Sequence, residues 1–339
     1  MPGPADDGVI DVHTHVVPEH FPTYLGRGTG VPWPSTVPAQ ACHRHVMLSG
    51  KVYRTVSHQC WSCAVRLADM DERSVRRQVL SPMPELLAPW LDAEDGRALG
   101  RHLNETIAAM VAESPERFTG LGAVPLQDVD VAIAELDRLL HETGLAGVEL
   151  PSHVNGIALG DAHLKPFFEA AATWGAAVFV HPLRPCGMER LVGPAALEQV
   201  VAFPGEIGLA GASLVTSGRL AELPALRVAL SHGGGSLAML LPRLRHAQVC
   251  LPPVRDTLRE DALLSARRLW IDDLVYDAPT LQHLVALFGA DRVMAGSDYP
   301  FAIMDTDPAA SIDAGSFDTP TRAALRAGNA RRWLGLEAA

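Results

Sequence analysis

Eight short apolar runs, separated by segments with helical periodicity, constrain the fold of this chain more than any other feature. The runs span residues 9–17, 78–83, 118–126, 147–151, 176–182, 226–232, 269–273 and 292–300. A stretch with 3.6-residue spacing follows each run, most clearly at 129–140. Strands that alternate with helices form parallel sheets, so eight such units predict a (β/α)8 TIM barrel of the α/β class. A doubly wound open sheet is the alternative, but no GxGxxG motif follows an early strand.

Residues 21–63 interrupt the alternation directly after the first predicted strand. This segment is rich in proline, glycine and histidine and shows little periodicity, so we predict an insertion that lies over the barrel mouth as a lid. Tyr53, Arg54, Cys60 and Trp61 favour a segment that makes contacts rather than a mobile linker. The chain has no internal repeat and no long low-complexity linker, so residues 1–339 are predicted to form a single domain.

Composition excludes several classes of partner. The formal net charge of −11 argues against nucleic acid or an anionic membrane surface as the main partner. The sequence contains no run of about 18 apolar residues, which predicts no membrane span. The acidic N-terminal residues lead straight into the first strand, so we expect no signal peptide. Five cysteines in a chain of this length are best interpreted as reduced thiols, which predicts a cytoplasmic protein.

Five polar side chains fall on strands or at strand ends of the predicted barrel. His13 and His15 lie two positions apart on the first strand and therefore share a face. His181 ends the fifth strand, His232 the sixth and Asp298 the eighth. The C-terminal ends of barrel strands meet at one mouth, so we expect these side chains to converge. An isolated HxH pair or strand-end histidine is more often structural. The prediction of a functional site therefore depends on all five side chains occurring together.

The residue types indicate one divalent metal ion. His13, His15 and His181 supply neutral nitrogen donors, and Asp298 supplies an anionic oxygen that can also accept a proton. A four-ligand set of this kind leaves room for water, whose pKa a zinc-class ion lowers to about 7. We assign His232 as a general acid or base, with metal coordination as the less favoured role. Asp298 and His232 are thus the predicted catalytic residues.

Motifs along the whole chain resemble the amidohydrolase superfamily. They are HTH at 13–15, HP at 181–182, SHGGG at 231–235, GSDYPF at 296–301 and GNARRWLGL at 328–336. In this order they are similar to the metal-dependent decarboxylase branch, within the group called amidohydrolase 2. YRTVSHQCW at 53–61 and FPGE at 203–206 extend the resemblance. It implies a single ion, zinc in the first place with manganese or iron(II) not excluded, and a role for His232 in activating metal-bound water.

The same resemblance implies how the substrate is held. Arg54 matches an arginine that binds a substrate carboxylate, and Arg243 matches one that reaches the neighbouring subunit's site in a homodimer. A guanidinium suits this role because it grips a carboxylate through two parallel hydrogen bonds. Phe301 and Trp61 are predicted as further substrate contacts. The implied activity is zinc-dependent nonoxidative decarboxylation of a small unsaturated or aromatic carboxylic acid, such as a carboxymuconate semialdehyde.

Departures from the branch keep a second function open. Relatives usually have Trp-Asp-Pro where this chain has WSC at 61–63, and HPWDM where it has HPLRP at 181–185. Arg184 therefore adds a cation at the mouth, and the substrate is predicted to carry another anionic or polar group. The alternative is a metal-dependent hydrolase or hydratase that acts on a related small carboxylic acid, lactone or amide. A silent, ligand-binding barrel is a third hypothesis, against which the intact ligand set argues.

Three other motifs have competing interpretations. His43 and His45 form a second HxH, which we expect off any strand and without a metal. Cys60 and Cys63 form a CxxC with no second pair, which favours plain thiols. Asp272 and Asp273 end the seventh strand, where they could line the mouth, support a metal ligand from outside the ligand set or cap a helix.

Overall fold

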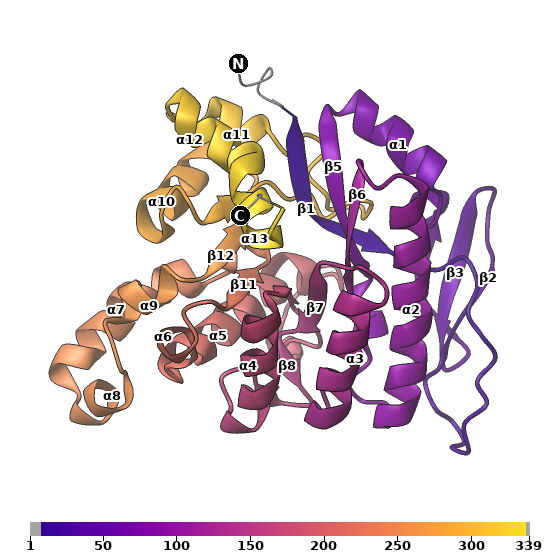
Figure 1. Ribbon diagram of the computed structural model, residues 1–339, viewed down its shortest axis with the longest axis horizontal. Coiled ribbons are helices and arrows are strands. Elements are labelled where there is room, and N and C mark those ends of the chain that lie inside the picture. The colour runs from indigo at the N-terminus through magenta and orange to yellow at the C-terminus, as the bar shows by residue number, and fades with distance from the viewer. Residues whose placement is uncertain (1–7, 337–339) are drawn as a thin grey trace.

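Eight parallel strands form the centre of the computed structural model, which describes residues 8–336 (Figure 1). In order around the sheet they are β1 (Val9–Val16), β5 (Val75–Pro82), β6 (Phe118–Gly122), β7 (Gly147–Pro151), β10 (Ala177–His181), β11 (Arg227–Leu230), β12 (Trp270–Asp272) and β13 (Val293–Met294). Each strand pairs in parallel with the next, which confirms the predicted barrel fold. β13 is much shorter than the predicted run 292–300, and β6 ends at Gly122 instead of residue 126.

Backbone hydrogen bonds bring the first strand to the last segment of the barrel. The N–H of His15 donates to the carbonyl of Tyr299 at 2.7 Å. The N–H of Asp298 donates to the carbonyl of His13 at 2.8 Å. These bonds fix the two histidines of β1 directly beside Asp298, although almost the whole chain separates them in sequence.

Helices follow the strands and cover the outside of the barrel (Figure 1). The longer ones are α1 (Cys63–Glu72), α2 (Ala93–Glu113), α3 (Val129–His141), α4 (Lys165–Trp174), α5 (Phe203–Thr216), α7 (Leu237–Cys250) and α10 (Ala278–Phe288). Shorter ones are α6 (Arg219–Glu222), α8 (Pro252–Thr257), α9 (Ala262–Ala266), α11 (Ala310–Ala314), α12 (Thr319–Ala323) and α13 (Asn329–Leu334). Helix α3 shows why these segments fold locally: Asp128 caps it by accepting from the N–H of Val131, and its apolar stripe is buried.

Two apolar layers stabilise the barrel. One lies between the strands and the outer helices and includes Phe167, Phe168 and Leu214. The other joins side chains of the barrel strands to the C-terminal helix α13, with Phe179 and Trp333 fully buried in it. The Phe179 ring lies 5.0 Å from that of His13 and 6.1 Å from that of Trp333, so an apolar column supports the polar mouth from below.

The insertion after β1 is an antiparallel sheet, not the irregular loop that its composition predicts. Its strands are β2 (Pro34–Pro38), β3 (His43–Leu48) and β4 (Lys51–Ser57). Ser49 and Gly50 connect β3 to β4 with φ angles of 51° and 75°, and two positive φ angles match the twist of a tight hairpin. Most of its side chains are partly or fully exposed, so the sequence lacks a clear apolar alternation. Its role as a lid stays a prediction.

One continuous helical segment, Glu198–Thr216, is long and apolar enough to cross a membrane by length and composition alone. It combines a wider turn at η5 (Glu198–Ala202) with α5. Ile207, Leu214 and Val215 of this segment are buried against the barrel, as expected of an outer helix of the fold. Its apolar character is therefore weak support for a membrane span.

Candidate metal centre and active site

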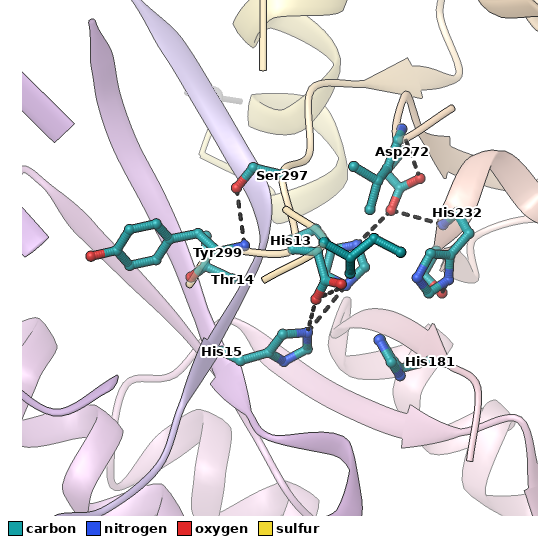
Figure 2. Close-up of polar contacts among 12 residues, drawn as sticks. His13, Thr14, His15, His181, His232, Asp272, Ser297 and Tyr299 are labelled. Atoms are coloured by element: carbon teal, nitrogen blue, oxygen red, sulfur yellow. Dashed lines mark hydrogen bonds and ion pairs between the residues drawn. The ribbon is translucent and has the colours of Figure 1, made fainter. Parts of the chain in front are cut away.

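Three imidazoles and one carboxylate converge at the C-terminal ends of the strands (Figure 2). The ligand atoms of His13, His15, His181 and Asp298 all lie within 4.8 Å of one another. His15 Nε2 is 3.1 Å from His13 Nε2 and 3.0 Å from Asp298 Oδ1. Ligands of a tetrahedral zinc ion with bonds of about 2.0–2.1 Å stand about 3.3 Å apart, so these separations suit a shared ion.

Hydrogen bonds orient the imidazoles for coordination. The Nδ1 atoms of His15 and His181 face the carbonyls of Pro82 at 3.1 Å and Pro182 at 2.9 Å, to which each must donate. The unprotonated Nε2 atoms then point into the cluster. His181 Nε2 is buried without a hydrogen-bond partner, a state that costs about 1–3 kcal/mol unless something satisfies it. A divalent cation fits this donor set.

Asp272 supports the third imidazole from outside the ligand set. Its Oδ2 lies 2.8 Å from His13 Nδ1, and its carboxylate also accepts from the backbone N–H groups of His232 and Gly233. Burial opposes a charge on His13, but this hydrogen bond and the negative charge of Asp298 raise the pKa of His13 to about 9. The sequence left several roles open for Asp272. The structure supports one of them, because Asp272 contacts the metal-ligand candidate His13.

Close packing holds this contact in place. A Cβ atom on Gly296 would lie 2.9 Å from Asp272 Cβ and 3.0 Å from His13 Cβ. Any larger side chain at position 296 would force the pair apart, which gives the glycine of the GSDYPF motif a physical reason.

We expect Asp272→Asn to weaken metal affinity by about 10- to 100-fold, because an amide cannot accept from His13 and two backbone N–H groups as a carboxylate does. Chelator competition followed by metal analysis would measure the affinity. Asp273→Asn is the matched control, since the neighbouring buried carboxylate accepts from the N–H of Gly296 and touches no imidazole. Equal affinities of the two variants would contradict the supporting role of Asp272.

His232 stands beside the cluster with its ring directed toward it (Figure 2). Its ring centroid is 5.2 Å from that of His181 and 5.3 Å from that of His13. Desolvation and positive charge on His13 lower the pKa of His232 to about 4, so the imidazole is neutral near pH 7 and can accept a proton. His232 and Asp298 have φ angles of 55° and 63°, and strained residues of this kind gather at functional sites.

A cleft of about 440 Å³, including its open mouth, leads to this centre. His181 and Asp298 line it together with Arg54 and Phe301. The Phe301 ring stacks on His15 at 5.0 Å, and the Arg54 guanidinium lies 4.3 Å from the centroid of the Phe301 ring. The inserted sheet therefore places the Arg54 cation against Phe301, whose ring stacks on the metal-ligand candidate His15, at the edge of the cleft.

The other predicted substrate contacts have different positions. Arg184 lines the cleft, but its guanidinium stacks on Trp90 at 3.2 Å. Trp61 packs against the apolar cluster beneath the inserted sheet and is not among the residues that line the cleft. Arg243 is exposed on α7, an outer helix, and does not line the cleft of its own chain. Within one chain, the positions of Trp61 and Arg243 give no support to direct substrate contact.

The remaining histidine and cysteine motifs form no part of the centre. His43 and His45 lie on β3, contrary to the expectation that they lie off any strand. Their Nδ1 atoms contact a backbone carbonyl and the hydroxyl of Thr55. Cys60 and Cys63 are buried and free, as predicted for plain thiols.

Sequence reasoning missed one buried acid beside the centre. Glu149 lies on β7, is fully buried, and its Oε2 is 3.9 Å from His15 Nδ1. Burial raises the pKa of Glu149 to about 8. The signal that could have revealed it is a single carboxylate inside the apolar run at 147–151, because an acid is rarely fully buried without a role.

The fold and the site define a class of protein: a (β/α)8 barrel with a candidate mononuclear metal centre, built from three imidazoles and one carboxylate at the barrel mouth. The family model described as amidohydrolase matches residues 10–336, so the chain belongs to the amidohydrolase family. This confirms the resemblance recognised in the motifs.

Individual relatives agree with this assignment. The chain is 35% identical to 2-amino-3-carboxymuconate-6-semialdehyde decarboxylase of Dictyostelium discoideum. The match extends over 332 residues, which are 97% of this chain and 92% of the relative. It is 28% identical to gamma-resorcylate decarboxylase of Rhodococcus jostii (strain RHA1), over 70% of this chain and 77% of that one.

Solved structures share the fold. The apo form of Metarhizium anisopliae IDCase has a TM-score of 0.83 at 24% identity and covers 98% of both chains. A dihydroxybenzoic acid decarboxylase from Polaromonas sp. JS666, solved with manganese and 2-nitroresorcinol, has a TM-score of 0.74 at 24% identity and covers 81% of this chain and 86% of that one.

Proposed function

We propose that this chain is a zinc-dependent nonoxidative decarboxylase of a small unsaturated or aromatic carboxylic acid. The observation that carries the proposal is the convergence of three imidazole Nε2 atoms and Asp298 at a cleft that Arg54 also lines. The names of the relatives support the reaction type, since those from Dictyostelium and Rhodococcus are both decarboxylases.

The proposed function assigns metal binding and substrate binding to different side chains. His13, His15, His181 and Asp298 would hold the divalent ion, which when bound supplies Lewis-acid stabilisation of negative charge. Arg54 would bind a substrate carboxylate by two parallel hydrogen bonds and so fix the substrate in the cleft.

His232 would act as the general base and then as the general acid. Its low pKa keeps it neutral, so it first accepts a proton from water or a substrate hydroxyl group. As the bond to the leaving carboxyl group breaks, carbon dioxide departs and the electron pair stays on the substrate carbon. His232 then returns the proton to that carbon, so hydrogen replaces the carboxyl group, and the oxygen that first gave up the proton is reprotonated by solvent.

Measured release of carbon dioxide tests the proposal. Protein reconstituted with zinc, manganese or iron(II) would be incubated with 2-amino-3-carboxymuconate-6-semialdehyde and a series of hydroxybenzoic acids. We expect release from at least one acid with zinc and none after chelation. A ring-opened or hydrated product without gas would favour the hydrolase or hydratase alternative. Manganese is the rival ion, because the Polaromonas decarboxylase structure contains it.

Replacement of Arg54 should impair substrate binding without loss of the metal. We expect Arg54→Lys to raise KM by about tenfold or more, because lysine keeps the charge but cannot form the bidentate grip. Steady-state kinetics would measure KM and kcat, with Lys51→Ala on the same strand as the control for an exposed cation. An unchanged KM in Arg54→Lys would contradict carboxylate binding by Arg54.

We also propose a homodimer in which Arg243 reaches the neighbouring subunit's cleft. Large apolar side chains on the exposed face of α7 support a covered surface there, since Met239 is 76% exposed and Val249 is 81% exposed. The mass in solution, measured by light scattering, tests it; a monomer would contradict it. The cytoplasmic location, the single domain and the lid remain predictions.

A further inference from the structure

We infer that Glu85 selects substrates that carry a hydroxyl or amino group in addition to the carboxylate bound by Arg54. The inference rests on the proposed function, because it concerns the same cleft. It goes beyond that function by naming a chemical feature of the acid and the side chain that recognises it.

Glu85 is positioned by the end of a barrel strand. It lies in the short helical turn η2 (Pro84–Leu87), three residues after the end of β5. Its side chain is only 13% exposed, and it lines the same cleft as His181 and Asp298. A carboxylate in this position can contact a molecule that occupies this cleft.

The contacts of Glu85 leave much of its hydrogen-bonding capacity unused. The Tyr53 hydroxyl donates to Oε2 at 3.3 Å, well beyond the usual 2.7–2.8 Å or so for such a bond. A guanidinium nitrogen of Arg184 is 3.7 Å from Oε1, which is an ion-pair contact but too long for a hydrogen bond. An ionised carboxylate accepts about four hydrogen bonds, so Glu85 retains acceptor sites toward the cleft.

Arg184 lies at the mouth of the cleft, where it also contacts other side chains of the protein. Its guanidinium lies against Trp90 and beside Glu85, and its side chain is 52% exposed to solvent. The φ angle of Arg184 is 46°, a conformation rarely adopted by residues with a side chain, so the local backbone holds it there under strain. Its charge is therefore already matched to a protein carboxylate.

The charge balance of this region favours a donor over a second anionic group. Glu198 also lines the cleft, so it holds two carboxylates and two cations. Of the cations, Arg184 already contacts Glu85, and Arg54 would be occupied by the substrate carboxylate. A second substrate carboxylate placed near them would meet like charges, whereas an O–H or N–H group would donate to Glu85. Sites built around a specific hydrogen bond can reject analogues that lack the donor by factors up to about 10⁴–10⁵.

Matched probe pairs test the inference on the zinc-loaded full chain. The probes are benzoic acids with a hydroxyl or amino group at each ring position, each paired with the methyl-substituted acid of similar size. Calorimetry gives Kd, and carbon dioxide release gives kcat/KM. We expect the protein to prefer the donor-bearing acid at one position by at least about tenfold, and Glu85→Gln to reduce that preference to within about threefold.

Two further variants keep the test decisive. Glu198→Gln is the matched control from the same cleft and should retain the donor preference. Glu85→Asp keeps the charge on a shorter side chain and replaces Glu85→Gln if that variant does not fold. A preference that survives in Glu85→Gln, or in Glu85→Asp where that variant takes its place, or that is lost only in Glu198→Gln, would overturn the inference.

The failures of the two proposals are separable. If no probe releases carbon dioxide but donor-bearing acids bind more tightly and this depends on Glu85, the decarboxylase proposal fails and the selectivity inference stands. If carbon dioxide is released with equal efficiency from both members of every pair, the inference fails and the decarboxylase proposal stands.

Discussion

His181→Ala is expected to purify without tightly bound zinc and to lose at least about 10³-fold in carbon dioxide release. The structure gives a specific reason for choosing this ligand. His181 Nε2 is the buried imidazole atom of the cluster that has no protein partner, so its place in the structure is explained only by something it binds. Its removal takes one neutral nitrogen donor from the set and leaves two imidazoles and one carboxylate, so the ion would be held more weakly.

Metal content after dialysis against a weak chelator and carbon dioxide release would be measured on the same sample. His163→Ala is the control, since His163 is an exposed histidine in the turn before α4. Thermal unfolding of both variants shows whether the fold survives. A His181→Ala protein that keeps one equivalent of zinc and normal turnover would eliminate the metal-centre assignment.

His232→Asn should produce the opposite combination, with zinc retained and turnover lost. His232 stands outside the four-ligand cluster, and general acid–base catalysis typically contributes about 10²- to 10⁴-fold to a rate. Asparagine suits this position because it tolerates the positive φ angle of 55° that His232 adopts. We therefore expect kcat to fall by about 10²-fold or more while KM and the zinc content change little.

Single-turnover kinetics and metal analysis would check this separation. Ser231→Ala is a useful companion, because the Ser231 hydroxyl lies 2.9 Å from His232 Nδ1 and helps to orient the ring. It should lower kcat less than His232→Asn does. If His232→Asn lost zinc in step with activity, His232 would be a metal ligand and its proposed proton-transfer role would be wrong.

Most of the barrel and the membership of the centre could be predicted from the sequence. Side chains along a strand alternate between its two faces, so His13 and His15 share one face. Parallel barrel strands place their C-terminal ends at one mouth, which predicts that His181 and Asp298 lie near them. The individual roles of Arg54 and Arg243 came from the family resemblance and not from periodicity. The inserted sheet was missed because its strands are mostly exposed and carry little apolar alternation.

The sequence by itself determined which side chains reach the barrel mouth, because local periodicity and the geometry of parallel strands decide that. Only the tertiary structure decided which of them touch. The bond between His13 and Asp272 spans 259 positions, and the contacts of Glu85 with Tyr53 and Arg184 join an inserted sheet to two different strand ends. Such contacts depend on loop paths and side-chain directions after the chain has closed on itself, and no local pattern of residues encodes them.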